Sequence, residues 1–102
     1  MAGKKMTLSI PHRLTQEEAR RRVENGVTSF RNQFGAHLAQ VDERWTGNHM
    51  DFTFSVAGQS VSGCVDVFPD KVSLEIDLPW IFAMIADRLR GRIQQEGRKM
   101  LE

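Results

Sequence analysis

The chain has 102 residues, of which 40% are hydrophobic and 26% are charged, and its 14 basic and 13 acidic residues leave a net charge of +1. This length suits one domain with one core, so we expect residues 1–102 to form a single domain, with 1–5 flexible. The balanced charge argues against a nucleic-acid partner, because proteins that bind nucleic acids carry a strong excess of basic residues.

The cysteine count and the apolar runs indicate the cell compartment. Cys64 is the single cysteine, so it cannot form an internal disulfide and fits a reducing compartment. The N-terminus has no apolar stretch typical of a secretory signal. The longest apolar run, residues 78–86, is shorter than the roughly 20 residues needed to cross a bilayer. We therefore expect a cytoplasmic protein without a membrane span.

An amphipathic strand and an amphipathic helix begin the chain. Met6, Leu8 and Ile10 alternate with polar residues, which is the period of a half-buried strand. Thr15 predicts the start of a helix because its hydroxyl can cap the first turn, and Glu18, three residues later, can complete a capping box. A glycine follows the apolar stripe and predicts the helix end. The stripe consists of Ala19, Val23, Val27, Phe30 and Phe34.

His12 lies between this strand and this helix. We expect its ring to fix the turn through hydrogen bonds to nearby backbone groups, as polar side chains in such turns commonly do. The alternative is that His12 binds a ligand near the helix N-terminus.

The stretch of residues 36–45 has a less regular pattern. If it forms a strand, Ala39, Val41, Glu43 and Trp45 share one face, and a buried unpaired carboxylate is costly. We therefore expect Glu43 to lie on an edge strand or to be turned outward by a bulge. The alternative is a carboxylate that acts as a general base or binds a ligand in a pocket.

Three further strands are predicted in residues 50–56, 61–67 and 72–78, where apolar and polar residues alternate strictly. Tight turns separate these strands, so they must pair antiparallel, since parallel strands need long crossovers. One face of this sheet is apolar and the other is polar, which is typical of a sheet covered on one side. The order βαββββα predicts an α+β fold, an antiparallel sheet of about five strands with two helices packed on one face, similar to a helix-grip domain.

The last helix begins at Pro79, a residue favoured at the first helical position. Its first turns are apolar on every side, and α-helical geometry places Trp80 and Met84 opposite the stripe that faces the sheet. Such a surface is either covered by a sheet edge or loop, or it meets a second copy or a hydrophobic surface. A basic stripe follows, which is either solvated or contacts an anionic partner. The candidate interface residues are Trp80, Ile81, Met84, Arg88 and Arg92.

No catalytic or metal site is predicted from the sequence. The three histidines, His12, His37 and His49, match no metal-ligand spacing with Cys64 and fall on separate elements. Cys64 lies on the polar face of its strand with no activating histidine in evident reach. Since no nucleophile, base and orienting group can be assembled, we expect a protein that is not an enzyme and needs neither metal nor cofactor.

The sequence resembles the family of putative polyhydroxyalkanoic acid system proteins, which are short bacterial proteins associated with polyhydroxyalkanoate storage granules. The resemblance rests on residues 10–20, on Trp45-Thr46-Gly47-Asn48 followed by Phe52, and on the helix around residues 89–93. It extends from about residue 8 to residue 101. The resemblance implies a bacterial cytoplasmic setting and a link to storage-polymer metabolism, and it brings no established catalytic residues.

Two functions follow from these observations. The first is a non-enzymatic accessory protein of the polyhydroxyalkanoate system that binds the granule, one of its proteins or a second copy of itself as a homodimer. The second is a small domain that binds an apolar or acyl ligand between the sheet and the C-terminal helix. The pocket for such a ligand would be lined by Trp45, Phe52, Phe54, Leu74 and Phe82.

Overall fold

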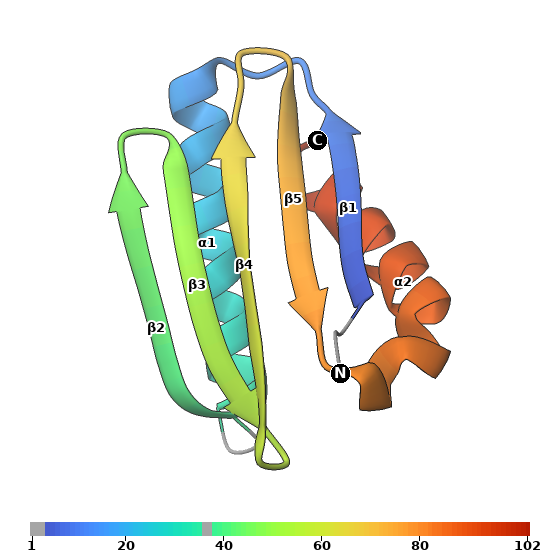
Figure 1. Cartoon of the computed structure of the whole chain (residues 1–102). Helices are drawn as coiled ribbons and strands as arrows, with labels where there is room; N and C mark the ends of the chain where they lie inside the picture. The colour runs from blue at the N-terminus through green and yellow to red at the C-terminus, as the bar shows by residue number, and fades with distance from the viewer. Residues whose placement is uncertain (1–3, 36–37) are drawn as a thin grey trace.

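The computed structural model describes residues 4–35 and 38–102 and shows an α+β fold (Figure 1). Within these residues, five strands and two α-helices follow one another in the predicted order, and a 3₁₀ helix that was not predicted precedes the last α-helix. In chain order they are β1 (Lys4–Pro11), α1 (Gln16–Phe34), β2 (Leu38–Thr46), β3 (His49–Val56), β4 (Gln59–Val67), β5 (Lys71–Leu78), η1 (Trp80–Ile85) and α2 (Ala86–Met100).

A few sequence-based expectations fall on residues that the structure does not describe. His37 and residues 1–3 lie outside the described residues, as do the side chains of Phe34 and Ala39. Of the N-terminal stretch expected to be flexible, residues 4 and 5 already belong to β1. Among the described residues, no helix combines the length and the apolar character that crossing a membrane requires.

The five strands form one antiparallel sheet in the order β1-β5-β4-β3-β2. Strands β2 to β5 follow one another through short turns. The first strand, β1, pairs with the last strand, β5. The turn between β3 and β4 contains Ala57 and Gly58, whose φ angles are 52° and 77°. Positive φ at both central residues is the geometry that matches a two-residue hairpin to the twist of its strands. This turn therefore fixes the register of the β3–β4 pair.

Both helices pack against the same face of the sheet, and the other face is open (Figure 1). The covered face carries the core, which divides into two clusters because the helices meet at one end of the sheet and cover its two halves. The first cluster comprises Ile10, Ala19, Val23, Met50, Val65, Val67, Val72 and Leu101. The second comprises Met6, Val61, Ile76, Leu78 and Ala86.

Strand β2 is an edge strand, one of the two explanations expected for Glu43. The bulge, between Ala39 and Asp42, does not turn Glu43 away from the helices. Glu43 lies opposite Phe52 and forms an ion pair with Arg31 of α1. Because β2 borders solvent, the carboxylate is both paired and partly hydrated, and the cost of a buried charge does not arise.

The last helix differs from the prediction in its first turns. Residues 80–85 form a 3₁₀ helix, and the α-helix begins only at Ala86. The Phe82 N–H donates to the Pro79 carbonyl at 2.9 Å, which is the i to i+3 bond of a 3₁₀ turn. Pro79 supplies no side-chain cap, and tight 3₁₀ turns are a common start for an α-helix. The residues that share a side of this segment therefore differ from those expected for an α-helix.

Candidate functional site

The 3₁₀ helix η1 presents most of its apolar side chains to solvent, and we call residues Trp80–Ile85 the apolar segment. Met84 is 96% exposed, Trp80 63%, Ile81 51% and Ile85 42%. Scattered exposed apolar residues are normal on a protein surface, but four within six consecutive residues form a continuous patch. The sequence left two alternatives for this segment. The first, in which a sheet edge or a loop covers it, is not seen among the described residues.

The apolar segment is held on the sheet by its inward side chain and by its two ends. Leu78 before it and Ala86 after it are buried in the second core cluster, and Phe82 packs against that cluster. With three residues per turn, positions i and i+3 lie above one another. Ile81 and Met84 therefore share one side, in place of the Trp80–Met84 pairing that α-helical geometry predicts. The exposed side chains project from a support that the core fixes at both ends.

Two arginines follow the apolar segment on α2. Arg88 and Arg92 are both exposed, and a spacing of four residues places them on the same side of the helix. Their guanidinium groups each offer five N–H donors. The helix that follows the apolar segment thus carries two cationic groups on one of its sides.

The five residues expected to line a ligand pocket are all half-buried parts of the core. Trp45 packs against the first cluster, Phe54 and Phe82 pack against the second, and Phe52 and Leu74 contact both. The Phe52 and Phe54 rings stack with centroids 6.2 Å apart. Surface hollows over the described residues occur between β1 and the start of α2 and along the outer side of α2, and neither is lined by any of these five. An apolar ligand under the helix therefore stays a prediction.

The turn between β1 and α1 is organised by His12 and Thr15. The His12 Nδ1 accepts from the Leu14 N–H at 3.1 Å, and its Nε2 lies 3.0 Å from the Phe68 carbonyl oxygen. Thr15 is the N-cap, and its hydroxyl accepts from the Glu18 N–H at 3.1 Å. His12 thus joins this turn to the β4–β5 turn, and its ring nitrogens are occupied by backbone groups.

Glu18 does not complete the capping box. Its carboxylate instead accepts hydrogen bonds from Arg21 at 2.7 Å and from Arg22 at 3.2 Å. Hydrogen bonds between charged groups are stronger than a bond to one neutral backbone N–H, so the arginines take the carboxylate. The bond from Arg21, and secondarily that from Arg22, lowers the pKa of Glu18.

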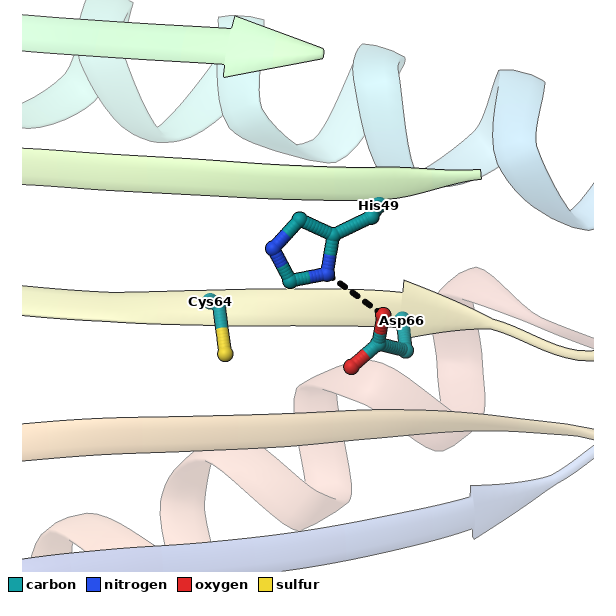
Figure 2. A group of neighbouring side chains, drawn as sticks. All are labelled: His49, Cys64 and Asp66. Atoms are coloured by element: carbon teal, nitrogen blue, oxygen red, sulfur yellow. Dashed lines mark hydrogen bonds and ion pairs between the residues drawn. The ribbon is translucent and has the colours of Figure 1, made fainter. Parts of the chain in front are cut away.

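The open face of the sheet brings together three side chains that the sequence analysis kept apart. His49 on β3 lies opposite Asp66 on β4, and Cys64 projects from β4 on the same face (Figure 2). One nitrogen, sulfur or oxygen atom of each lies within 4.8 Å of the others. The expectation that histidines and Cys64 are separated is therefore wrong for His49. It failed because separate strands become neighbours once they pair.

Two carboxylates hold the His49 ring. Its Nδ1 lies 2.5 Å from an Asp66 oxygen, and its Nε2 lies 3.2 Å from an Asp51 oxygen. The bond to Asp66, and then that to Asp51, raises the pKa of His49 above its ordinary value of 6.5, since both carboxylates favour the protonated ring. Each ring nitrogen thus has a carboxylate partner.

We expect Asp66→Asn to lower the pKa of His49, as measured by an NMR pH titration of the ring protons in buffer containing EDTA. A raised pKa in the folded state means that protonated His49 stabilises the fold below about pH 6.5, and that this contribution is lost as the pH rises through the folded-state pKa. Asp87→Asn, on α2, is the control and should leave the titration unchanged. An unaltered His49 titration in Asp66→Asn would contradict the assignment.

Cys64 is a protonated thiol at neutral pH. Burial raises the pKa of Cys64, and the nearby Glu75 carboxylate raises it further. The sulfur donates toward a Glu75 oxygen at 3.6 Å. Because the thiolate is the nucleophilic form, this environment makes Cys64 a weak nucleophile.

Comparison with known proteins adds one finding. A family model described as "Putative polyhydroxyalkanoic acid system protein" matches residues 6–101. Neither the curated proteins nor the solved structures contain a match to the chain. The family match covers nearly the whole domain, from β1 to the end of α2.

Proposed function

The chain belongs to the family of putative polyhydroxyalkanoic acid system proteins, and from this premise we propose that it is a non-enzymatic accessory protein that binds the surface of polyhydroxyalkanoate granules through its apolar segment. In this proposal the protein acts in the cytoplasm, where such granules are stored. The observation that carries the proposal is the exposure of Trp80, Ile81, Met84 and Ile85 in a segment whose two ends are buried in the core.

The chemistry of the apolar segment suits such a surface. A polyhydroxyalkanoate is a polyester, so it offers hydrocarbon groups together with ester carbonyls that only accept hydrogen bonds. Trp80 and Met84 can bury apolar area against the hydrocarbon, at roughly 25 cal/mol per Å². Arg88 and Arg92, exposed on the helix that follows, can donate to the carbonyls without losing their charge to burial.

The environment of Cys64 supports a role without catalysis. A thiol that donates to Glu75 and has a raised pKa is a poor candidate for covalent chemistry. His49, the histidine close to it, is held between two carboxylates. A binding role requires neither group to react.

The proposal is tested by co-sedimentation of the purified chain with poly(3-hydroxybutyrate) particles. The double variant Trp80→Ser/Met84→Ser is expected to lower the apparent affinity by at least roughly tenfold, since each buried large apolar side chain contributes about 1.5–3 kcal/mol. Phe68→Ser is the matched control, because Phe68 is also an exposed aromatic residue, 39% accessible, but lies in the β4–β5 turn. Its binding should equal that of the wild type.

The same pair of variants is then compared in cells that contain granules. The fluorescent protein is fused after Glu102, since Lys4 at the other end pairs with Leu78, next to the apolar segment. Wild type and Phe68→Ser should collect on granules, and the double variant should be diffuse. Equal binding by all three proteins would overturn the proposal. So would a dimer in light scattering that the double variant dissociates, because the segment would then be a contact between two copies.

A further inference from the structure

We propose that His49, Cys64 and Asp66, on the open face of the sheet, form a binding site for a divalent transition-metal ion, with Zn²⁺ as the best fit. This site lies on the opposite face of the sheet from the helices (Figures 1 and 2). It goes beyond the proposed granule binding and is independent of it.

The three donor atoms already converge. They lie within 4.8 Å of one another, and a tetrahedral Zn²⁺ with bonds of about 2.0–2.3 Å needs its ligands roughly 3.4–3.7 Å apart. His49 Nδ1 and the Asp66 oxygen, 2.5 Å apart, must separate by about 1 Å, and the other pairs must approach by up to about 1 Å. Side-chain rotation at an open surface can supply both shifts. The backbone need not move, because β3 and β4 are paired along their whole length.

The donor set selects the kind of ion. One imidazole nitrogen, one sulfur and one carboxylate oxygen suit a borderline-soft ion such as Zn²⁺ or Co²⁺. Mg²⁺ and Ca²⁺ prefer oxygen ligands alone, so they fit poorly. When the ion binds, the Cys64 sulfur forms the metal bond as a thiolate and His49 Nδ1 binds as a deprotonated ring nitrogen, so the thiol proton and the proton on Nδ1 both pass to solvent.

Two neighbouring carboxylates complete the surroundings. Asp51 Oδ1 lies 3.2 Å from His49 Nε2, so that N–H can keep its acceptor while Nδ1 binds the ion. A carboxylate behind a metal-bound histidine is a common support that orients the ring. Glu75 Oε2 lies 3.6 Å from the Cys64 sulfur, within reach of a fourth coordination position. Without it, water would occupy that position.

The site differs from an ordinary acidic surface in its composition and its register. The strand pairing places His49 opposite Asp66, and Cys64 opposite both Asp51 and Glu75. The three ligands thus meet on two adjacent strands, β3 and β4, at positions that the backbone fixes, and Glu75 lies beside them on β5. The exposure of the face leaves the approach of an ion open.

The test uses the full chain, treated with EDTA and dialysed, and titrated with ZnCl₂, CoCl₂ or MgCl₂. We expect one Zn²⁺ per chain by calorimetry, a thiolate-to-cobalt charge-transfer band in the near ultraviolet, and no Mg²⁺ binding. Cys64→Ser should abolish the band, and His49→Ala and Asp66→Asn should each weaken Zn²⁺ binding at least roughly tenfold. Ser62→Ala is the matched control, because Ser62 lies on the same strand two residues before Cys64. This variant should bind Zn²⁺ as the wild type does.

A second readout guards against variants that fold poorly. Zn²⁺ should raise the midpoint of thermal unfolding of the wild type by mass action, and should raise it less in His49→Ala at the same Zn²⁺ concentration. Circular dichroism without metal shows whether each variant is folded. A wild type that shows neither the cobalt band nor Zn²⁺ binding would overturn the proposal. A band that survives in His49→Ala/Asp66→Asn would also overturn it, because the sulfur alone would then hold the ion.

Discussion

Replacing Gly63 with alanine is expected to destabilise the domain by about 1–3 kcal/mol, a large share of the roughly 5–15 kcal/mol that holds a small domain folded. Gly63 lies in the middle of β4, where an added Cβ would collide with the Glu75 carbonyl oxygen and would lie 2.7 Å from Cζ of Phe52. The carbonyl belongs to the neighbouring strand and cannot rotate away. The Phe52 ring occupies the space that a side chain would need.

The measurement is urea unfolding followed by circular dichroism, and Gly91→Ala is the matched control. A Cβ at Gly91, in α2, meets nothing within 4 Å, and alanine is favoured over glycine in a helix by roughly 0.5–1 kcal/mol. The same substitution should therefore lower stability at one position and raise it at the other. Equal stability of Gly63→Ala and wild type would show that β4 and β5 can separate to admit the methyl group.

Met50→Ala is expected to cost about 2–5 kcal/mol, the usual range for removing a large buried side chain. Met50 is 2% exposed and belongs to the first core cluster, between the sheet and α1. Its neighbours come from both layers, so they cannot close the resulting cavity without moving a helix. Urea unfolding again gives the free-energy difference.

Thr53→Ala serves as the control for Met50→Ala because Thr53 lies on the same strand and faces the open side. A change there should stay within about 0.5 kcal/mol, as is usual for exposed positions. If both variants lost stability equally, the first cluster would not be the part of the core that its burial indicates.

The fold could be predicted from the sequence because its strands alternate without interruption. Met50, Val61, Val65 and Val72 are the apolar members of that alternation, and all are buried. The single exception was β2, where a bulge interrupts the period between Ala39 and Asp42. A bulge inserts one extra residue and so exchanges the faces of the residues that follow it. Because no residue type marks the position of the bulge, the pattern alone could not show on which side Glu43 lies.

The sequence showed that the start of the last helix is apolar, but it did not show that this start is a 3₁₀ helix. Residues 80–85 adopt 3₁₀ turns between Leu78 and Ala86, whose burial in the core holds the two ends of the segment. That is a tertiary constraint, and propensity is too weak to reveal it. The exposure of Met84 depends on the same constraint.

The cluster on the open face had a signal in the sequence that spacing rules for metal ligands do not use. A two-residue turn at Ala57 and Gly58 fixes which residues of β3 and β4 face each other, and it places His49 opposite Asp66. Cys64 then follows on the same face two positions away. The side-chain rotation that turns the His49 ring toward Asp66 could not be read from that register, because it depends on local hydrogen bonds.

The pairing of β1 with β5 has a consequence for how quickly the chain reaches its native state. Residues 4–11 are synthesised well before their partner strand, which begins at residue 71. Closing so long a loop must precede the contacts that reward it, and domains dominated by distant strand pairs fold in milliseconds to seconds, roughly, whereas helical bundles need microseconds to milliseconds. Strands β2 to β5 can pair with one another as a local meander before β1 joins the sheet. Until β1 docks, one edge of β5 and the apolar side chains of β1 remain open to other chains.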